Sequence, residues 1–354
     1  MDGDEHMNKN RRQFLAAAAA MPFTSVLADA DRRKRLGIVQ YSYALRLSAD
    51  RAAGKTGFHD PLTFLEHCHE LGAGGVQIGL GTRDKDYLAR LRKKLEAYGM
   101  DLEGTIRLPK DRAETERFTA EARCAREAGV KVLRTVLMGG RRYEQFTRAE
   151  HFRRAREQAE LSVRLAEPIV AKHDLLLAIE NHKDYRAEEL MELLRRLGSR
   201  HVGVCVDTGN SIALLEDPLE VVRTLAPRAF TVHLKDMAVA EYEDGFLLAE
   251  VPLGEGFLDL RKSIAVLREA RPGIRFNLEM ITRDPLRVPC LTEKYWATAT
   301  ASGRDLARTL AMVRKRKPKH SLPRISGKGA KEQLAIEEEN VRKSLAYAYE
   351  HLSL

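Results

Sequence analysis

The sequence predicts an α/β protein built as a (β/α)8 barrel with a C-terminal helical extension. Three observations predict this fold. Short apolar runs rich in β-branched residues alternate with amphipathic stretches of helical period. The eight strands and the helices between them occupy about 250 residues, the usual size of such a barrel. A dinucleotide-binding sheet shows the same alternation of strands and helices, but a GxGxxG phosphate loop follows its first strand. No such loop follows the first predicted strand here.

Each predicted element follows from its local pattern. The strands are short apolar runs at residues 36–42, 75–78, 102–106, 132–137, 175–180, 202–207, 230–233 and 275–279. The helices between them carry apolar residues three or four positions apart, at residues 61–71, 87–98, 115–128, 149–173, 187–197, 218–225 and 260–271. Many of these helices are closed by a glycine that precedes the next strand, at Gly72, Gly99, Gly129 and Gly198.

Composition excludes several classes of protein. The chain has 354 residues, with 60 Lys and Arg against 51 Asp and Glu, a formal net charge of +9, and 44% hydrophobic residues. These values exclude disordered, collagen-like and disulfide-scaffold proteins. Because the basic residues are mixed with nearly as many acids, we expect a solvated basic surface and no nucleic-acid partner. The four cysteines form no CxxC pair, which argues against zinc-ribbon and thioredoxin-like functions.

Residues 1–30 are predicted to be a twin-arginine-type export signal. Paired arginines at 11–12 precede an alanine-rich apolar run at 16–26 and a small-residue cleavage pattern at 28–30. The apolar run is too short to span a bilayer stably. We therefore expect a periplasmic or otherwise exported protein, with a cytoplasmic location as the alternative if the segment is only a basic surface stretch.

The predicted barrel domain covers residues 31–314, and residues 315–354 are predicted to form a basic linker and a C-terminal helix. A further helix is expected at 304–313, and the last helix at 332–352. The last helix presents an apolar stripe that must be buried, and we expect it to pack on the outside of the barrel rather than against a partner. The stripe consists of Leu334, Val341, Leu345, Ala348 and Leu352.

Four consecutive predicted strands end in residues that can bind a metal or a substrate. The carboxyl ends of barrel strands converge on one site. Because side chains alternate along a strand, Glu180 and His182 share one side, as do His233 and Lys235. Three carboxylates and one imidazole suit Mn²⁺ or Mg²⁺, with Co²⁺ or Zn²⁺ also possible. This set consists of Glu180, Asp207, His233 and Glu279.

The ordered motifs at these strand ends resemble the sugar phosphate isomerase/epimerase family, the xylose-isomerase-like TIM barrels. They are Glu180-Asn181-His182, Asp207-Thr208-Gly209-Asn210, His233-Leu234-Lys235-Asp236, Pro252-Leu253-Gly254-Glu255-Gly256 and Glu279. The resemblance covers residues 36–314. It implies that Glu180, Asp207, His233 and Glu279 bind the metal and that Glu180 and Glu279 are the catalytic acid/base pair. One departure is Asn210, because many ketose epimerases have a histidine at this position.

We expect a divalent-metal-dependent isomerase or epimerase that acts on a keto-sugar or sugar derivative through a metal-stabilised enediolate. Substrate contacts are expected from His182, Asn210, Lys235 and Arg283. The alternatives are a metal-dependent lyase, either a decarboxylase or a dehydratase, on an oxidised sugar, and a non-catalytic sugar-binding barrel. Phosphodiester hydrolysis on DNA is disfavoured because few histidines lie at strand ends. The expected partner is a small carbohydrate, and the resemblance implies a possible homo-oligomer.

Overall fold

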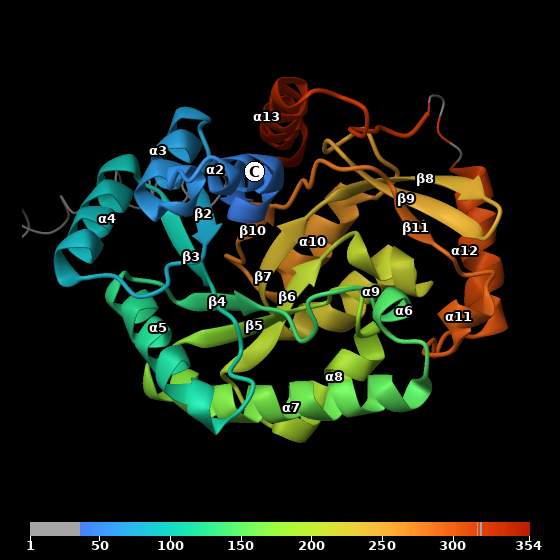
Figure 1. The fold of residues 1–354 in the computed structure, drawn as a ribbon, viewed down its shortest axis with the longest axis horizontal. Helices are drawn as coiled ribbons and strands as arrows, with labels where there is room; N and C mark the ends of the chain where they lie inside the picture. Colours follow the sequence, from blue (N-terminus) through green and yellow to red (C-terminus); the bar gives the residue numbers. More distant parts are fainter. Residues whose placement is uncertain (1–35, 317, 319–320) are drawn as a thin grey trace, which may run out of the picture.

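The computed structural model describes residues 36–316, 318 and 321–354, so the predicted export signal lies outside the described residues. Eight parallel strands close into a barrel in the order β1-β10-β7-β6-β5-β4-β3-β2, which confirms the predicted fold class (Figure 1). The strands are β1 (Gly37–Val39), β2 (Gly75–Ile78), β3 (Asp101–Thr105), β4 (Val132–Thr135), β5 (Leu176–Glu180), β6 (Val202–Asp207), β7 (Ala229–Leu234) and β10 (Phe276–Leu278).

Seven helices connect successive barrel strands and bury one apolar face each. They are α3 (Pro61–Glu70), α4 (Lys85–Tyr98), α5 (Thr115–Glu127), α7 (Ala149–Lys172), α8 (Ala187–Leu197), α9 (Pro218–Leu225) and α10 (Leu260–Ala270). Their ends follow local chemistry: the Asp84 carboxylate accepts a hydrogen bond from the Tyr87 N–H at the start of α4, and Gly99 ends the helix with φ of 61°. Among the described residues, no helix combines the length and the apolar character needed to cross a membrane.

Shorter helical segments lie in the loops. They are the α-helices α2 (Ala44–Ala52), α6 (Arg142–Gln145) and α11 (Glu293–Trp296) and the 3-10 turns η1 (Gln40–Tyr43), η2 (Gly57–His59), η3 (Arg112–Glu114), η4 (Asn210–Leu214) and η5 (Ala226–Arg228). The first predicted strand is therefore shorter than expected, because the chain turns into η1 directly after β1.

A three-stranded antiparallel sheet, which the sequence pattern did not predict, projects from the barrel beyond β7. It contains β8 (Asp236–Tyr242), β9 (Gly245–Val251) and β11 (Leu286–Val288) in the order β11-β9-β8. Helix α12 (Gly303–Lys315) packs beside this sheet (Figure 1). Phe246, Leu248, Val288 and Val313 share an apolar cluster separate from that of the barrel. The sheet positions Glu250 near the end of β9.

The C-terminal helix α13 (Ala330–Tyr347) continues into a π-helical turn, η6 (Ala348–Leu352). Val341, Ala348 and Leu352 are buried in the main core of the barrel. The carboxylate of Glu337 accepts backbone hydrogen bonds from Leu45 at 2.7 Å and Arg46 at 3.0 Å, at the start of α2. The helix predicted as an extension therefore takes the place of the eighth barrel helix, separated from β10 by β11, α11 and α12.

Candidate active site

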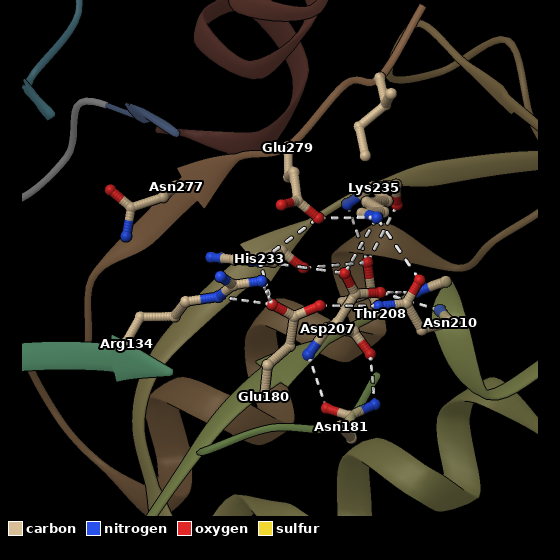
Figure 2. A network of polar contacts seen from close by, with 12 residues as sticks. Arg134, Glu180, Asn181, Asp207, Thr208, Asn210, His233, Lys235, Asn277 and Glu279 are labelled. Carbon is tan, nitrogen blue, oxygen red and sulfur yellow. Dashed lines mark hydrogen bonds and ion pairs between the residues drawn. The ribbon is translucent and has the colours of Figure 1, made fainter. Parts of the chain in front are cut away.

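The four predicted ligand residues meet at the carboxyl end of the barrel. Glu180 and Asp207 are the last residues of β5 and β6, His233 lies at the end of β7 opposite Asp207, and Glu279 directly follows β10. One side-chain ligand atom from each residue can be chosen so that all four lie within 4.8 Å of one another, and all four residues are buried (Figure 2). The parallel register of adjacent strands produces this convergence.

The Asp207 carboxylate has one oxygen that makes no hydrogen bond. Its Oδ1 accepts hydrogen bonds from the backbone N–H groups of Gly209 and Asn210, both at 2.8 Å. Its buried Oδ2 makes no hydrogen bond and lies 3.2 Å from the ammonium nitrogen of Lys235. A buried oxygen left in this state fits a metal ligand, because a bound cation would satisfy it.

His233 is oriented by a hydrogen-bonded chain that ends in a buried acid. The side-chain amide of Gln77 donates to Glu103 at 3.0 Å, so its carbonyl oxygen faces His233 Nε2 at 2.8 Å and accepts the Nε2 proton. Glu103 also accepts hydrogen bonds from Thr231 at 2.7 Å and Asn277 at 2.9 Å. His233 Nδ1 is buried without a hydrogen bond and faces the carboxylates, which is the arrangement of a metal-binding histidine.

Both oxygens of Glu180 are held by donors that keep their protons. Arg134, on β4, donates through Nε to Oε2 at 2.7 Å and through a second guanidinium nitrogen to the same oxygen. The side-chain amide of Asn210 donates to Oε1 at 2.9 Å. Burial alone would raise the pKa of Glu180, but Arg134 outweighs it and holds the pKa at about 2. Glu180 is therefore a fixed anion.

Lys235 joins the ligand cluster to a carboxylate of the antiparallel sheet. Its Nζ lies 2.7 Å from Glu279 Oε2 and 3.4 Å from Glu250 Oε1. Glu250 also forms an ion pair with Arg283 at 2.7 Å and accepts the Ile281 N–H at 2.8 Å. Two predicted substrate contacts, Lys235 and Arg283, thus share one buried acid that sequence reasoning missed. Glu250 ends an apolar run, the same signal that marked the other acids.

Two further residues of the loop after β5 lie beside this cluster. His182 is half-buried, and burial together with the charge of Lys183 lowers its pKa to about 3, so the imidazole is neutral at pH 7. Lys183, which sequence reasoning also missed, is 2% exposed and donates a hydrogen bond from Nζ to Asn210 Oδ1. Asn210 therefore links Lys183 to Glu180 through the two ends of one amide.

The fold and site together define a closed (β/α)8 barrel whose carboxyl end holds three buried acids and a buried histidine that could bind a metal ion. The family model described as "Xylose isomerase-like TIM barrel" matches residues 65–310. The chain belongs to this family, which confirms the resemblance found in the sequence.

Proteins similar to this chain are named for different activities. The chain is 28% identical over 231 residues to the 3-oxo-isoapionate decarboxylase of Pectobacterium atrosepticum, covering 63% of this chain and 77% of the relative. It also resembles the solved structure of a D-psicose 3-epimerase, with a TM-score of 0.53, 16% identity and coverage of 80% and 99% of the two chains. The probable 3-DHS dehydratase AsbF of Bacillus anthracis gives a TM-score of 0.52 at 16% identity, covering 70% and 93%. At such identities the structural likenesses show the fold alone.

Proposed function

We propose that this protein is a divalent-metal-dependent enzyme that converts a keto-sugar or a sugar acid through an enediolate. The observation that carries the proposal is the convergence of Glu180, Asp207, His233 and Glu279, whose ligand atoms lie within 4.8 Å of one another. Buried atoms without hydrogen bonds at Asp207 Oδ2 and His233 Nδ1 support a bound cation. Three oxygen ligands and one nitrogen fit Mn²⁺ or Mg²⁺ best, with Co²⁺ or Zn²⁺ as alternatives.

The two glutamates at the edges of the cluster have different surroundings. When bound, a divalent cation would supply Lewis acidity toward the substrate carbonyl and its neighbouring hydroxyl, worth several kcal/mol. Glu279 lies 2.7 Å from the Lys235 ammonium, and Lys235 and His233 outweigh burial to hold the pKa of Glu279 well below its usual range, so Glu279 is an anion that can accept a proton at one face of the substrate. Glu180 is held by Arg134, which cannot give up a proton in a protein.

This asymmetry favours a reaction with one proton transfer at carbon. Decarboxylation of an oxidised sugar needs one proton, which replaces the lost carboxyl group, and the Lys235 ammonium beside Glu279 carries a proton that can fill this role. The similarity to a decarboxylase over 77% of that relative supports the same outcome. Epimerisation, our second candidate, needs a proton acceptor and a donor on opposite faces, and Glu180 and Glu279 supply the two carboxylates that it requires.

Turnover in deuterated solvent separates these outcomes. The purified chain is stripped of metal, reloaded with Mn²⁺ and given 3-oxo sugar acids or neutral keto-sugars, with products followed by NMR. We expect metal-dependent release of CO₂ and one deuterium at the carbon that lost it, whereas an epimerase exchanges one α-hydrogen without other mass change. Asp207→Asn should abolish turnover, and the exposed Glu243→Gln should not. Metal-dependent ligand binding without any turnover would instead indicate a sugar-binding barrel and refute the proposal.

We also propose that the protein is exported, on the evidence of residues 1–30. Cell fractionation of the full chain and of an Arg11→Lys, Arg12→Lys double variant tests this. Periplasmic wild type with a cytoplasmic variant supports export. A cytoplasmic location of both refutes it.

A further inference from the structure

Lys183 is a buried cation whose one hydrogen-bond acceptor among residues 36–316, 318 and 321–354 is neutral. Its side chain is among the largest that are fully buried, and its ammonium donates to the amide oxygen of Asn210. Within the described part of the chain it forms no ion pair. The other buried cations differ: Lys235 lies within 3.4 Å of three carboxylates, and Arg142 pairs with Glu189 at 2.9 Å.

Packing alone gives no reason to keep a charge in this position. A buried charge is costly unless an opposite charge compensates for it. An ammonium has three N–H donors, and the hydrogen bond to Asn210 uses one of them. The remaining donors can bind an anionic group without breaking an ion pair.

The charge of the surrounding site points to the same ligand. Apart from Glu103 and His233, the ionic groups linked by the contacts described above are four carboxylates and four cations. A divalent ion bound in place of the His233 proton would give the site a net positive charge. The carboxylates are Glu180, Asp207, Glu250 and Glu279, and the cations are Arg134, Lys183, Lys235 and Arg283.

We propose that Lys183 is a specificity-determining residue that binds the carboxylate of an oxidised sugar, an inference that rests on the proposed function. A carboxylate supplies one negative charge, and in decarboxylation this charge passes to the enediolate as the carbon–carbon bond breaks and CO₂ leaves, so the positive site stabilises it throughout. A phosphate monoester carries about −1.5 to −2 at pH 7 and would cancel more of this positive charge before reaction. Lys183 lies one amide away from Glu180, so a carboxylate there is close to the reacting atoms.

Calorimetry with non-reacting probes tests the assignment. L-threonate, its neutral counterpart L-threitol, and inorganic phosphate are each titrated into the Mn²⁺-loaded full chain. We expect threonate to bind at least about tenfold more tightly than threitol or phosphate, because a charged hydrogen bond is gained. Lys183→Met should lose about tenfold in threonate affinity while threitol affinity and Mn²⁺ stoichiometry stay unchanged. Lys183→Arg should retain most of the preference, and the exposed Lys262→Met should match wild type.

The outcomes separate this inference from the proposed function. Equal binding of threonate and threitol to wild type, or tighter binding of phosphate, would overturn the role of Lys183 while Mn²⁺ binding leaves the proposed function standing. Failure of wild type to bind Mn²⁺ would overturn both. If Lys183→Met does not fold, the wild-type preference for threonate and the Lys183→Arg variant still test the assignment. Loss of this preference in a folded Lys183→Arg variant would refute a simple contact between a cation and the carboxylate.

Discussion

The hydrogen bond from His233 to Gln77 provides a sharp test of the site, because the buried Gln77 contacts Nε2 while the carboxylates face Nδ1 on the other side of the imidazole. Gln77→Leu removes the 2.8 Å contact to His233 Nε2 and the 3.0 Å contact to Glu103. Glu103 keeps its hydrogen bonds from Thr231 and Asn277. The main loss therefore falls on His233, whose Nε2 proton remains buried without an acceptor.

The expected magnitude follows from comparable contacts. Partners that orient a metal-binding histidine typically contribute about 10- to 100-fold in metal affinity, or about 1.4–2.7 kcal/mol. A buried donor left unsatisfied costs about 1–3 kcal/mol of folding stability. We expect Gln77→Leu to weaken Mn²⁺ binding by about 10- to 100-fold in calorimetry. In urea titrations, the unfolding free energy of the metal-free chain should fall by about 1–3 kcal/mol.

A matched control separates the site from a general effect of the substitution. Gln145 is exposed on α6, so Gln145→Leu should leave both Mn²⁺ affinity and stability at wild-type values. If Gln77→Leu binds Mn²⁺ within about twofold of wild type, then His233 does not depend on this chain of hydrogen bonds and the reasoning is refuted.

Two further predictions concern stability. Burial raises the pKa of Glu216 to about 7, so the folded state holds this proton more tightly than the unfolded state. The proton therefore stabilises the folded state at low pH, and this contribution is lost as pH rises from about 4.5 through 7. Between pH 5 and 8, the unfolding free energy of Glu216→Gln should therefore fall by about 2–3 kcal/mol less than that of wild type. Equal pH dependence of the variant and wild type in urea titrations would contradict this. Glu337→Ala removes two hydrogen bonds at the start of α2 and should cost about 1–2 kcal/mol in thermal unfolding, whereas the exposed Glu339→Ala should cost nothing measurable.

The barrel was predictable because its elements depend on local patterns. Strands buried on both faces read as short apolar runs, and β2 and β6 match their predicted bounds at 75–78 and 202–207. An acid that ends such a run stands out, which is how Glu180, Asp207 and Glu279 were found. The barrel topology then brings these acids together, because all barrel strands present their carboxyl ends to one site.

The parts that were missed depend on contacts between distant segments. One residue separates β7 from β8, so the antiparallel sheet looked like loop after the seventh strand. The apolar stripe of α13 was visible in the sequence, but the segment that α13 contacts at the start of α2 was not. The hydrogen bond from Leu45 to Glu337 joins residues 292 positions apart. Likewise Lys183 follows its strand as an ordinary charged loop residue, and only its contact with Asn210 reveals a buried cation.

The central claim is that Glu180, Asp207, His233 and Glu279 hold one divalent cation. Crystals grown with Mn²⁺ and measured for anomalous scattering test this directly. The account predicts one strong peak at about 2.0–2.4 Å from one ligand atom of each residue. No peak at saturating Mn²⁺, or a peak elsewhere with this cluster empty, would contradict it.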